Sequence, residues 1–105
     1  MKAFATLAAG LIAAAVALPA SASPEAAMHR AGCMACHAKD RKMIGPSFRD
    51  IAARYKGRKD SMQHLMNTVR RGGAGVYGPV PMPPTTADKI SDADLQAAVA
   101  FILNS

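Results

Sequence analysis

The sequence is poor in aromatic residues and in cysteine. It contains no tryptophan, its aromatic residues make up 5% of the chain, and Cys33 and Cys36 are its only cysteines. A structural zinc site takes four ligands from paired Cys or His clusters, and neither His29 nor His64 belongs to a second pair. Downstream of residue 22, no run of alternating apolar and polar residues predicts a β-strand. The sequence therefore predicts an all-α fold.

Acidic side chains are also few. Seven Asp and Glu residues stand against 13 Lys and Arg residues, which gives a formal net charge of +6 at pH 7. A basic surface favours acidic partners and raises the rate at which they are encountered. The chain has no recognised nucleic-acid-binding motif to accompany this charge, so we expect no nucleic-acid partner.

The most informative motif is Cys33-Met34-Ala35-Cys36-His37. Cys-x-x-Cys-His is typical of c-type haem attachment, because two thiols three positions apart can each add to one vinyl group at the haem edge. His37 is then carried beneath the ring, where its imidazole can take the proximal position on the iron. We predict one covalent haem c, bound through Cys33 and Cys36. Pro46, nine residues after His37, can pack its carbonyl or ring beside the imidazole, or is simply a loop proline before a helix.

A Cys-x-x-Cys pair also occurs in thiol–disulfide proteins of the thioredoxin kind. In those proteins the motif follows a strand in a βαβ unit, a pattern that this sequence lacks. An exported chain without haem could still form a Cys33–Cys36 disulfide. The thiol couple and a zinc site are therefore the alternatives to haem.

The first 22 residues have the pattern of a secretory signal peptide. Lys2 provides a positive charge, residues 3–18 are almost continuously apolar, and Ala20-Ser21-Ala22 is an A-x-A-like cleavage site. The alternative is a retained membrane anchor, but the apolar run is shorter than the roughly 20 residues that a spanning helix needs. We predict cleavage after Ala22, a periplasmic location without stable membrane insertion, and a single domain over residues 23–105. A domain of this size usually needs a cofactor to complete its core, and haem would fill that role.

Four stretches carry helix signals. They run from about residue 24 to 31 or 32, from 47 to 56, from 59 to 71, and from 91 to near the C-terminus, and Ser23 and Ser91 can cap the first and the last. Each stretch has apolar or small residues at helical spacing. The predicted buried faces are Ala27, Met28, Ala31 and Gly32; Phe48, Ile51, Ala52 and Tyr55; Met62, Leu65, Met66 and Val69; and Leu95, Ala97, Ala98, Val99, Phe101 and Ile102. We expect the last helix to cross the first.

Residues 71–84 form a stretch rich in glycine and proline. Its glycines contain a G-x-G-x-x-G match, but a dinucleotide-binding fingerprint must open a helix, and prolines at positions 79, 81, 83 and 84 forbid one. The prolines that flank Met82 limit its freedom, so its thioether can be presented at low entropic cost. With His37 on one face of a haem and Met82 on the other, the coordination would be of an electron-transfer type with a raised reduction potential. We predict Met82 as the second axial ligand.

Other methionines and histidines are weaker ligand candidates. Met62 and Met66 lie at helical spacing, which is ordinary for core residues that fill gaps. His29 is expected to be an exposed helical residue, and His64 is the strongest rival for the second axial position.

From residue 23 onward the sequence resembles the small bacterial class I cytochromes c of the cytochrome c-551 (c8) type. The resemblance covers essentially all of residues 23–105 and rests on the haem motif and three further runs. These runs are Lys42-Met43-Ile44-Gly45-Pro46, Asp50-Ile51-Ala52-Ala53 and Gly75-Val76-Tyr77-Gly78-Pro79-Val80-Pro81-Met82-Pro83-Pro84. The last run is much more specific than the haem motif, which occurs in many unrelated cytochromes.

The resemblance implies about four helices around one haem, with His37 and Met82 as axial ligands. It also implies a periplasmic carrier that passes single electrons from an upstream cytochrome donor to a terminal reductase or oxidase. Relatives typically have Trp at the position of Tyr77, where it bonds a haem propionate, so Tyr77 is a candidate for that contact. Thr85 stands where relatives often have Asn near the axial sulfur.

We therefore expect an electron carrier and not an enzyme, because two protein ligands leave no open position on the iron. If Met82 is not a ligand, an open iron could instead bind small molecules or act as a peroxidase-like enzyme. We expect a monomer whose basic rim steers acidic redox proteins to the haem edge. The predicted members of this rim are Lys39, Arg41, Lys42, Arg49, Arg54, Lys56, Arg58, Lys59 and Arg70.

Overall fold

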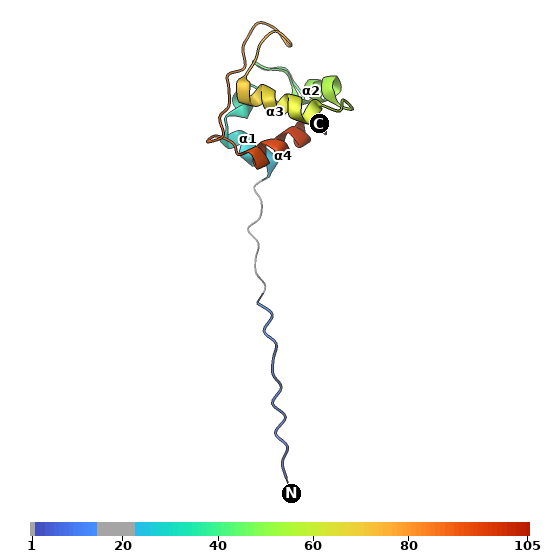
Figure 1. The fold of residues 1–105 in the computed structure, drawn as a ribbon, viewed down its shortest axis with the longest axis vertical. Helices are drawn as coiled ribbons and strands as arrows, with labels where there is room; N and C mark the ends of the chain where they lie inside the picture. Colours follow the sequence, from blue (N-terminus) through green and yellow to red (C-terminus); the bar gives the residue numbers. More distant parts are fainter. Residues whose placement is uncertain (1, 15–22) are drawn as a thin grey trace.

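The computed structural model describes residues 2–14 and 23–105. Residues 2–14 are exposed and have no secondary structure, whereas residues 23–105 form a helical domain (Figure 1). Its helices are α1 (Pro24–Arg30), the short 3₁₀-helix η1 (Cys33–Ala35), α2 (Phe48–Tyr55), α3 (Ser61–Arg71) and α4 (Asp92–Leu103). The predicted cleavage site, Ala20-Ser21-Ala22, lies outside the described residues, so the signal peptide remains a prediction.

The four predicted helices are present, with bounds one or two residues shorter than expected. At three N-termini a serine hydroxyl accepts a hydrogen bond from the backbone N–H three residues on, which satisfies one of the donors that a helix start leaves free. These pairs are Ser23 with Ala26 (3.2 Å), Ser47 with Asp50 (3.1 Å) and Ser91 with Asp94 (3.1 Å). After α1 the chain turns at Gly32, whose φ of +86° is a left-handed conformation that favours glycine.

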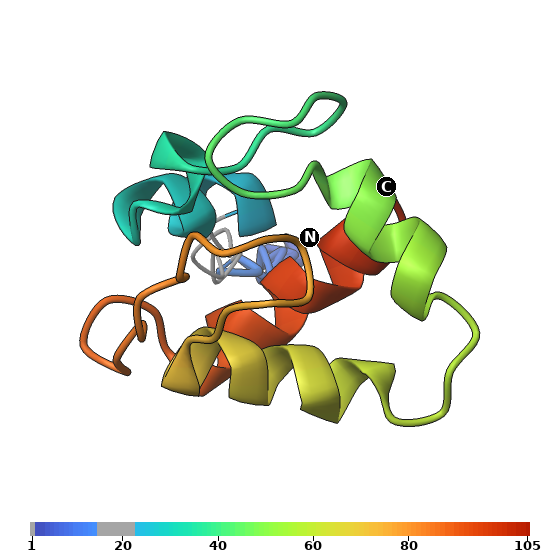
Figure 2. The ribbon, with the colours of Figure 1, turned by 90° about the horizontal axis from the view of Figure 1, so that it is seen from above.

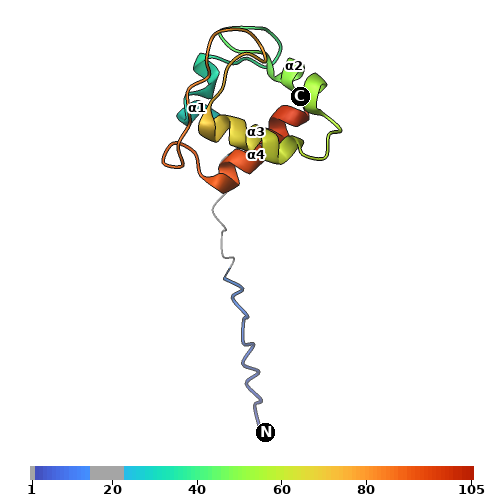
Figure 3. The same cartoon turned by 45° about the horizontal axis from the view of Figure 1, so that its top comes forward.

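The core is built around α4. Helices α1, α2 and α3 each pack against it, as Figures 2 and 3 show, so the predicted crossing of the last helix with the first is present. The largest of the fully buried side chains come from three different helices: Val99 is 0% exposed, Met28 1% and Phe48 2%. The core thus joins segments that are far apart in the sequence.

Most of the predicted buried faces are buried. In α2 all four residues of the face are buried, in α3 Leu65 is buried and its apolar neighbours are half-buried, and in α4 Leu95, Ala98 and Val99 are buried. The prediction was wrong for Gly32 after α1 and for Ala97 in α4, both of which are exposed. Ala97 lies beside the buried face of α4 and not on it, because α4 presents Leu95, Ala98 and Val99 to the other helices.

No strand forms within residues 2–14 and 23–105, and the all-α prediction is confirmed. The sheet-type pairing in this part of the chain is an isolated antiparallel bridge between Gly73 and Met82. No helix among the described residues is long and apolar enough to cross a membrane.

Candidate haem site

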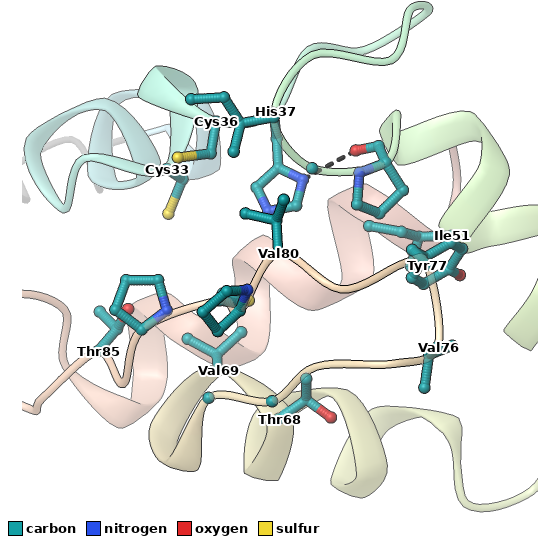
Figure 4. A pocket seen from close by; sticks show the side chains of 18 of the residues that line it. Cys33, Cys36, His37, Ile51, Thr68, Val69, Val76, Tyr77, Val80 and Thr85 are labelled. Carbon is teal, nitrogen blue, oxygen red and sulfur yellow. Dashed lines mark hydrogen bonds between the residues drawn. The ribbon is translucent and has the colours of Figure 1, made fainter.

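A cavity of about 830 Å³ lies between the Cys33–His37 segment, α3 and the loop that follows α3. We call residues 72–84 the Met82 loop. Figure 4 shows the thiols of Cys33 and Cys36 and the ring of His37 on one side of this cavity, with Val80 of the Met82 loop facing His37. Residues that the sequence separates by more than forty positions therefore meet around one space.

The two cysteines are held by η1. The backbone N–H groups of Cys36 and His37 both donate to the carbonyl of Cys33, at 3.2 and 3.0 Å, which brings the two thiols and the imidazole into one tight turn. Both thiols are free and half-buried. Burial raises the pKa of the Cys33 thiol, with a smaller contribution in the same direction from Cys36.

The His37 ring is oriented by its neighbours. Its Nδ1 lies 2.8 Å from the carbonyl oxygen of Pro46, which is the contact that the nine-residue spacing left open, and the ring stacks on Phe48 at 5.6 Å between centroids and 22° between planes. A carbonyl can only accept, so Nδ1 carries the proton and donates it. In the neutral imidazole this tautomer leaves the lone pair of Nε2 free, which is the state that a metal ligand requires.

Gly45 makes room for this ring, a role not predicted from the sequence. A Cβ at position 45 would lie 2.6 Å from Cε1 and 2.9 Å from Nδ1 of His37, closer than ordinary van der Waals contact. The Gly45 N–H also donates to the carbonyl of Cys36 at 2.8 Å, which folds the loop back over the haem motif. The Gly-Pro dipeptide signals a turn, but nothing local signals that the His37 ring packs on it.

Met82 lines the cavity on the side of the loop. Gly73 and Met82 exchange two backbone hydrogen bonds, of 3.1 and 2.7 Å, which close the base of the Met82 loop. Gly72 allows this closure, because it has a φ of +73° and a Cβ there would overlap the carbonyl oxygen of Met82. The half-buried Met82 is therefore held at the cavity by backbone contacts on both sides of the loop.

Tyr77 and Thr85 also line the cavity. Tyr77 is 38% exposed, and the guanidinium of Arg54 lies 5.6 Å from the centroid of its ring. Burial raises the pKa of the Tyr77 phenol, so its hydroxyl keeps its proton near neutral pH and can donate a hydrogen bond. Thr85 is half-buried and its backbone N–H donates to the carbonyl of Val69 at 2.8 Å.

The weaker ligand candidates lie elsewhere. His29 is exposed on α1, and His64 is exposed on α3 with its ring 5.1 Å from that of Tyr55. Met62 and Met66 pack against the core. These four residues are absent from the cavity lining, and the described part of the chain holds no cluster of three His, Cys, Asp or Glu side chains that could bind a metal ion.

One member of the predicted basic rim is placed differently. The side chain of Arg70 is 22% exposed and donates to two backbone carbonyls as well as to Asp92, so the prediction that it belongs to the basic rim was wrong. Two other members are exposed but form ion pairs, Arg49 with Asp40 (2.9 Å) and Arg58 with Asp60 (3.4 Å). Three of the nine predicted rim residues are therefore paired with a carboxylate.

The residues present fit haem c. Two half-buried thiols and an imidazole with a free Nε2 line the same cavity as a methionine thioether, and the remaining lining is largely apolar. A planar apolar macrocycle with polar carboxylates at one edge suits such a space.

Comparisons with known proteins identify the family. A family model described as cytochrome c oxidase, cbb3-type, subunit III matches residues 20–102. Cytochrome c-552 of Hydrogenobacter thermophilus is 42% identical over 73 residues, which cover 70% of this chain and 71% of that protein. Cytochrome c-551 of Pseudomonas aeruginosa is 38% identical over 81 residues, which cover 77% of this chain and 75% of that protein.

Solved structures agree with the sequence relatives. The crystal structure of cytochrome c552 from Nitrosomonas europaea superposes with a TM-score of 0.69 at 37% identity and covers 74% of this chain and 94% of its own. The class 1 cytochrome MtoD of Sideroxydans lithotrophicus, at 23% identity and a TM-score of 0.65, shares the fold. The predicted cofactor is confirmed: the chain carries haem c through Cys33 and Cys36. It belongs to the small bacterial class I cytochromes c of the c-551 and c-552 type.

Proposed function

We propose that this protein is a periplasmic respiratory electron carrier whose haem iron is ligated by His37 and Met82. Its relatives are electron-transfer cytochromes c. The observation that carries the proposal is that His37, with Nε2 free, and Met82, held on the closed loop, line one cavity from two separate segments.

The chain's own residues prepare both ligands. When bound, haem c supplies an iron that changes by one electron. The carbonyl of Pro46 fixes the tautomer of His37, and the Phe48 ring and the absence of a Cβ at Gly45 set its orientation. Met82 needs little ordering on binding because its loop is closed at the base and its proline neighbours have fixed φ.

The proposal gives the protein no enzymatic role, because two protein ligands occupy both axial positions of the iron. With an imidazole and a thioether in place, oxygen or peroxide finds no open position, so the protein carries electrons and does not catalyse a reaction. Tyr77 lines the cavity and the guanidinium of Arg54 lies over its ring, so the two supply a phenolic donor and a positive charge to an acidic group beside Tyr77.

Location and partners follow from the N-terminal pattern and the charge. The signal-peptide pattern of residues 1–22 supports export to the periplasm. The excess of Lys and Arg over Asp and Glu, which remains after removal of Lys2, supports acidic partners, namely a terminal reductase or oxidase and an upstream cytochrome donor. Lys42 and Lys89 border the cavity and are exposed, so they are placed to meet such a partner. We propose that the protein acts as a monomer.

The test is the visible spectrum of the ferric holoprotein and of Met82→Ala. We expect a far-red charge-transfer band from methionine ligation in the wild type and its loss in Met82→Ala, with the haem still covalently attached in both. Wild-type protein that lacks the band, or whose ferrous form binds carbon monoxide under native conditions, would contradict the proposal and favour an open-iron, peroxidase-like protein.

A further inference from the structure

The Met82 loop is attached at both ends to the last turn of α3. At its start, the Gly73–Met82 bridge forms two residues after the helix ends. At its exit, the backbone N–H of Thr85 donates to the carbonyl of Val69 at 2.8 Å. The side chain of Arg70 reaches the same residue, since its Nη1 donates to the carbonyl of Thr85 at 3.2 Å. Two neighbouring residues of α3 therefore hold the loop exit.

The other terminal nitrogen of Arg70 holds the start of α4. Nη2 donates to the carbonyl of Ile90 at 2.9 Å and to the carboxylate of Asp92 at 2.7 Å. Ile90 is 4% exposed and directly precedes Ser91, the N-cap of α4. One guanidinium thus joins the end of α3, the exit of the Met82 loop and the beginning of the central helix.

The two hydrogen bonds from Arg70 to backbone carbonyls contribute more to stability than its ion pair with Asp92. The side chain of Asp92 is 83% exposed, and an ion pair with such a partner contributes little. The Arg70 side chain is 22% exposed, and hydrogen bonds from a charged donor to backbone carbonyls in a half-buried site are stronger. A lysine would keep the charge but not the planar fork that lets Arg70 reach acceptors on two segments at once.

We propose that Arg70 is a positioning residue for Met82, because its bonds to residues 85 and 90 keep the loop exit on α3 and the thioether at the cavity. This inference rests on the proposed ligation of the iron by Met82. Loss of the Arg70 bonds frees the loop exit and raises the fraction of molecules in which Met82 has left the iron. An external ligand that competes with Met82 then binds more tightly, in proportion to that fraction.

The test is the affinity of ferric holoprotein for imidazole at pH 7. Arg70→Gln should bind imidazole about tenfold more tightly than the wild type, Arg70→Lys should lie between the two, and Asp92→Asn should change the affinity by less than about threefold. The matched control is Arg71→Gln. Arg71 is the exposed next residue of α3, and within the described part of the chain it makes no side-chain hydrogen bond or ion pair. Its loss removes the same charge, and we expect its imidazole affinity to stay within about twofold of the wild type.

Repeating the measurement in the Met82→Ala variant distinguishes a positioning role of Arg70 from a general loss of stability. In Met82→Ala the competing ligand is gone, so Arg70→Gln should no longer change the imidazole affinity. An effect of Arg70→Gln that persists at full size in Met82→Ala would overturn the positioning role, as would an affinity equal to that of Arg71→Gln. If Arg70→Gln fails to fold, Arg70→Lys decides, and wild-type affinity in that variant overturns the inference.

Failure of the proposed function has a different signature. If the wild type lacks the far-red methionine band and Met82→Ala leaves the spectrum unchanged, Met82 is not a ligand and both proposals fall. If the band is present and is lost in Met82→Ala, but substitution of Arg70 leaves the imidazole affinity unchanged, only the positioning role is wrong.

Discussion

At the scale of single residues, the orientation of His37 depends most on an atom that is absent, the Cβ of Gly45. Gly45→Ala places a methyl group 2.6 Å from Cε1 of His37, so the ring or the loop must shift. We expect the free energy of unfolding of the ferric holoprotein, measured by denaturant titration, to fall by about 1–3 kcal/mol. Gly73→Ala is the control, because a Cβ there meets no atom within 4 Å and its φ is not left-handed. Equal losses in the two variants would show that the His37 contact is not the cause.

Residue roles could be predicted from the sequence where the signal is local. The haem motif and the Met82 loop are contiguous runs, and the His37–Pro46 spacing already left the observed hydrogen bond open. The roles of Gly45 and Arg70 were not predictable, because each arises from a contact with a segment whose approach only the folded chain defines. Arg70 in particular was interpreted as a surface charge, since its acceptors are 15 to 22 residues further along the chain.

At the scale of elements, α4 is the helix on which the other three depend. Val99 is fully buried in it, packs in the core with residues of the other helices and also lines the cavity. Val99→Ala removes two methyl groups and leaves a void, so we expect the free energy of unfolding of the holoprotein to fall by about 2–3 kcal/mol. Ala97→Ser, on the exposed side of the same helix, should change it by less than about 0.5 kcal/mol. A comparable loss in both variants would show that packing at position 99 is not the cause, since helix propensity alone would favour alanine over valine there.

Helix existence and type were predictable because each helix has local signals: a capping serine at three of the four N-termini and an apolar face at helical spacing. Helix bounds were less so. The sequence placed the start of α3 at residue 59, whereas the helix begins at Ser61, whose hydroxyl donates to the carbonyl of Arg58 in the preceding turn at 3.0 Å. Such a turn competes with the first residues of a helix without leaving a distinct pattern.

At the scale of the whole molecule, three helices pack on α4 and leave a cavity of about 830 Å³ among segments that include the haem motif and the Met82 loop. A domain this small has little apolar surface to bury, so a large cofactor in the cavity completes its core. The same placement puts the exposed Lys42 and Lys89 at the border of the cavity, whereas Lys59 lies in the connection between α2 and α3 and away from it. The position of each charge, and not only the net value, therefore bears on partner encounter.

Charge-reversal variants distinguish the effect of a charge's position from the effect of the net charge. Lys42→Glu and Lys59→Glu change the net charge equally, but only Lys42 borders the cavity. If the rim steers anionic partners, oxidation of the ferrous protein by hexacyanoferrate(III), followed by stopped flow at low ionic strength, should slow severalfold more in Lys42→Glu than in Lys59→Glu. The difference should vanish as salt is raised, because the Debye length falls from about 10 Å at 0.1 M to about 3 Å at 1 M. Equal slowing in the two variants would assign the effect to net charge alone. An oxidation rate that does not depend on ionic strength would rule out steering.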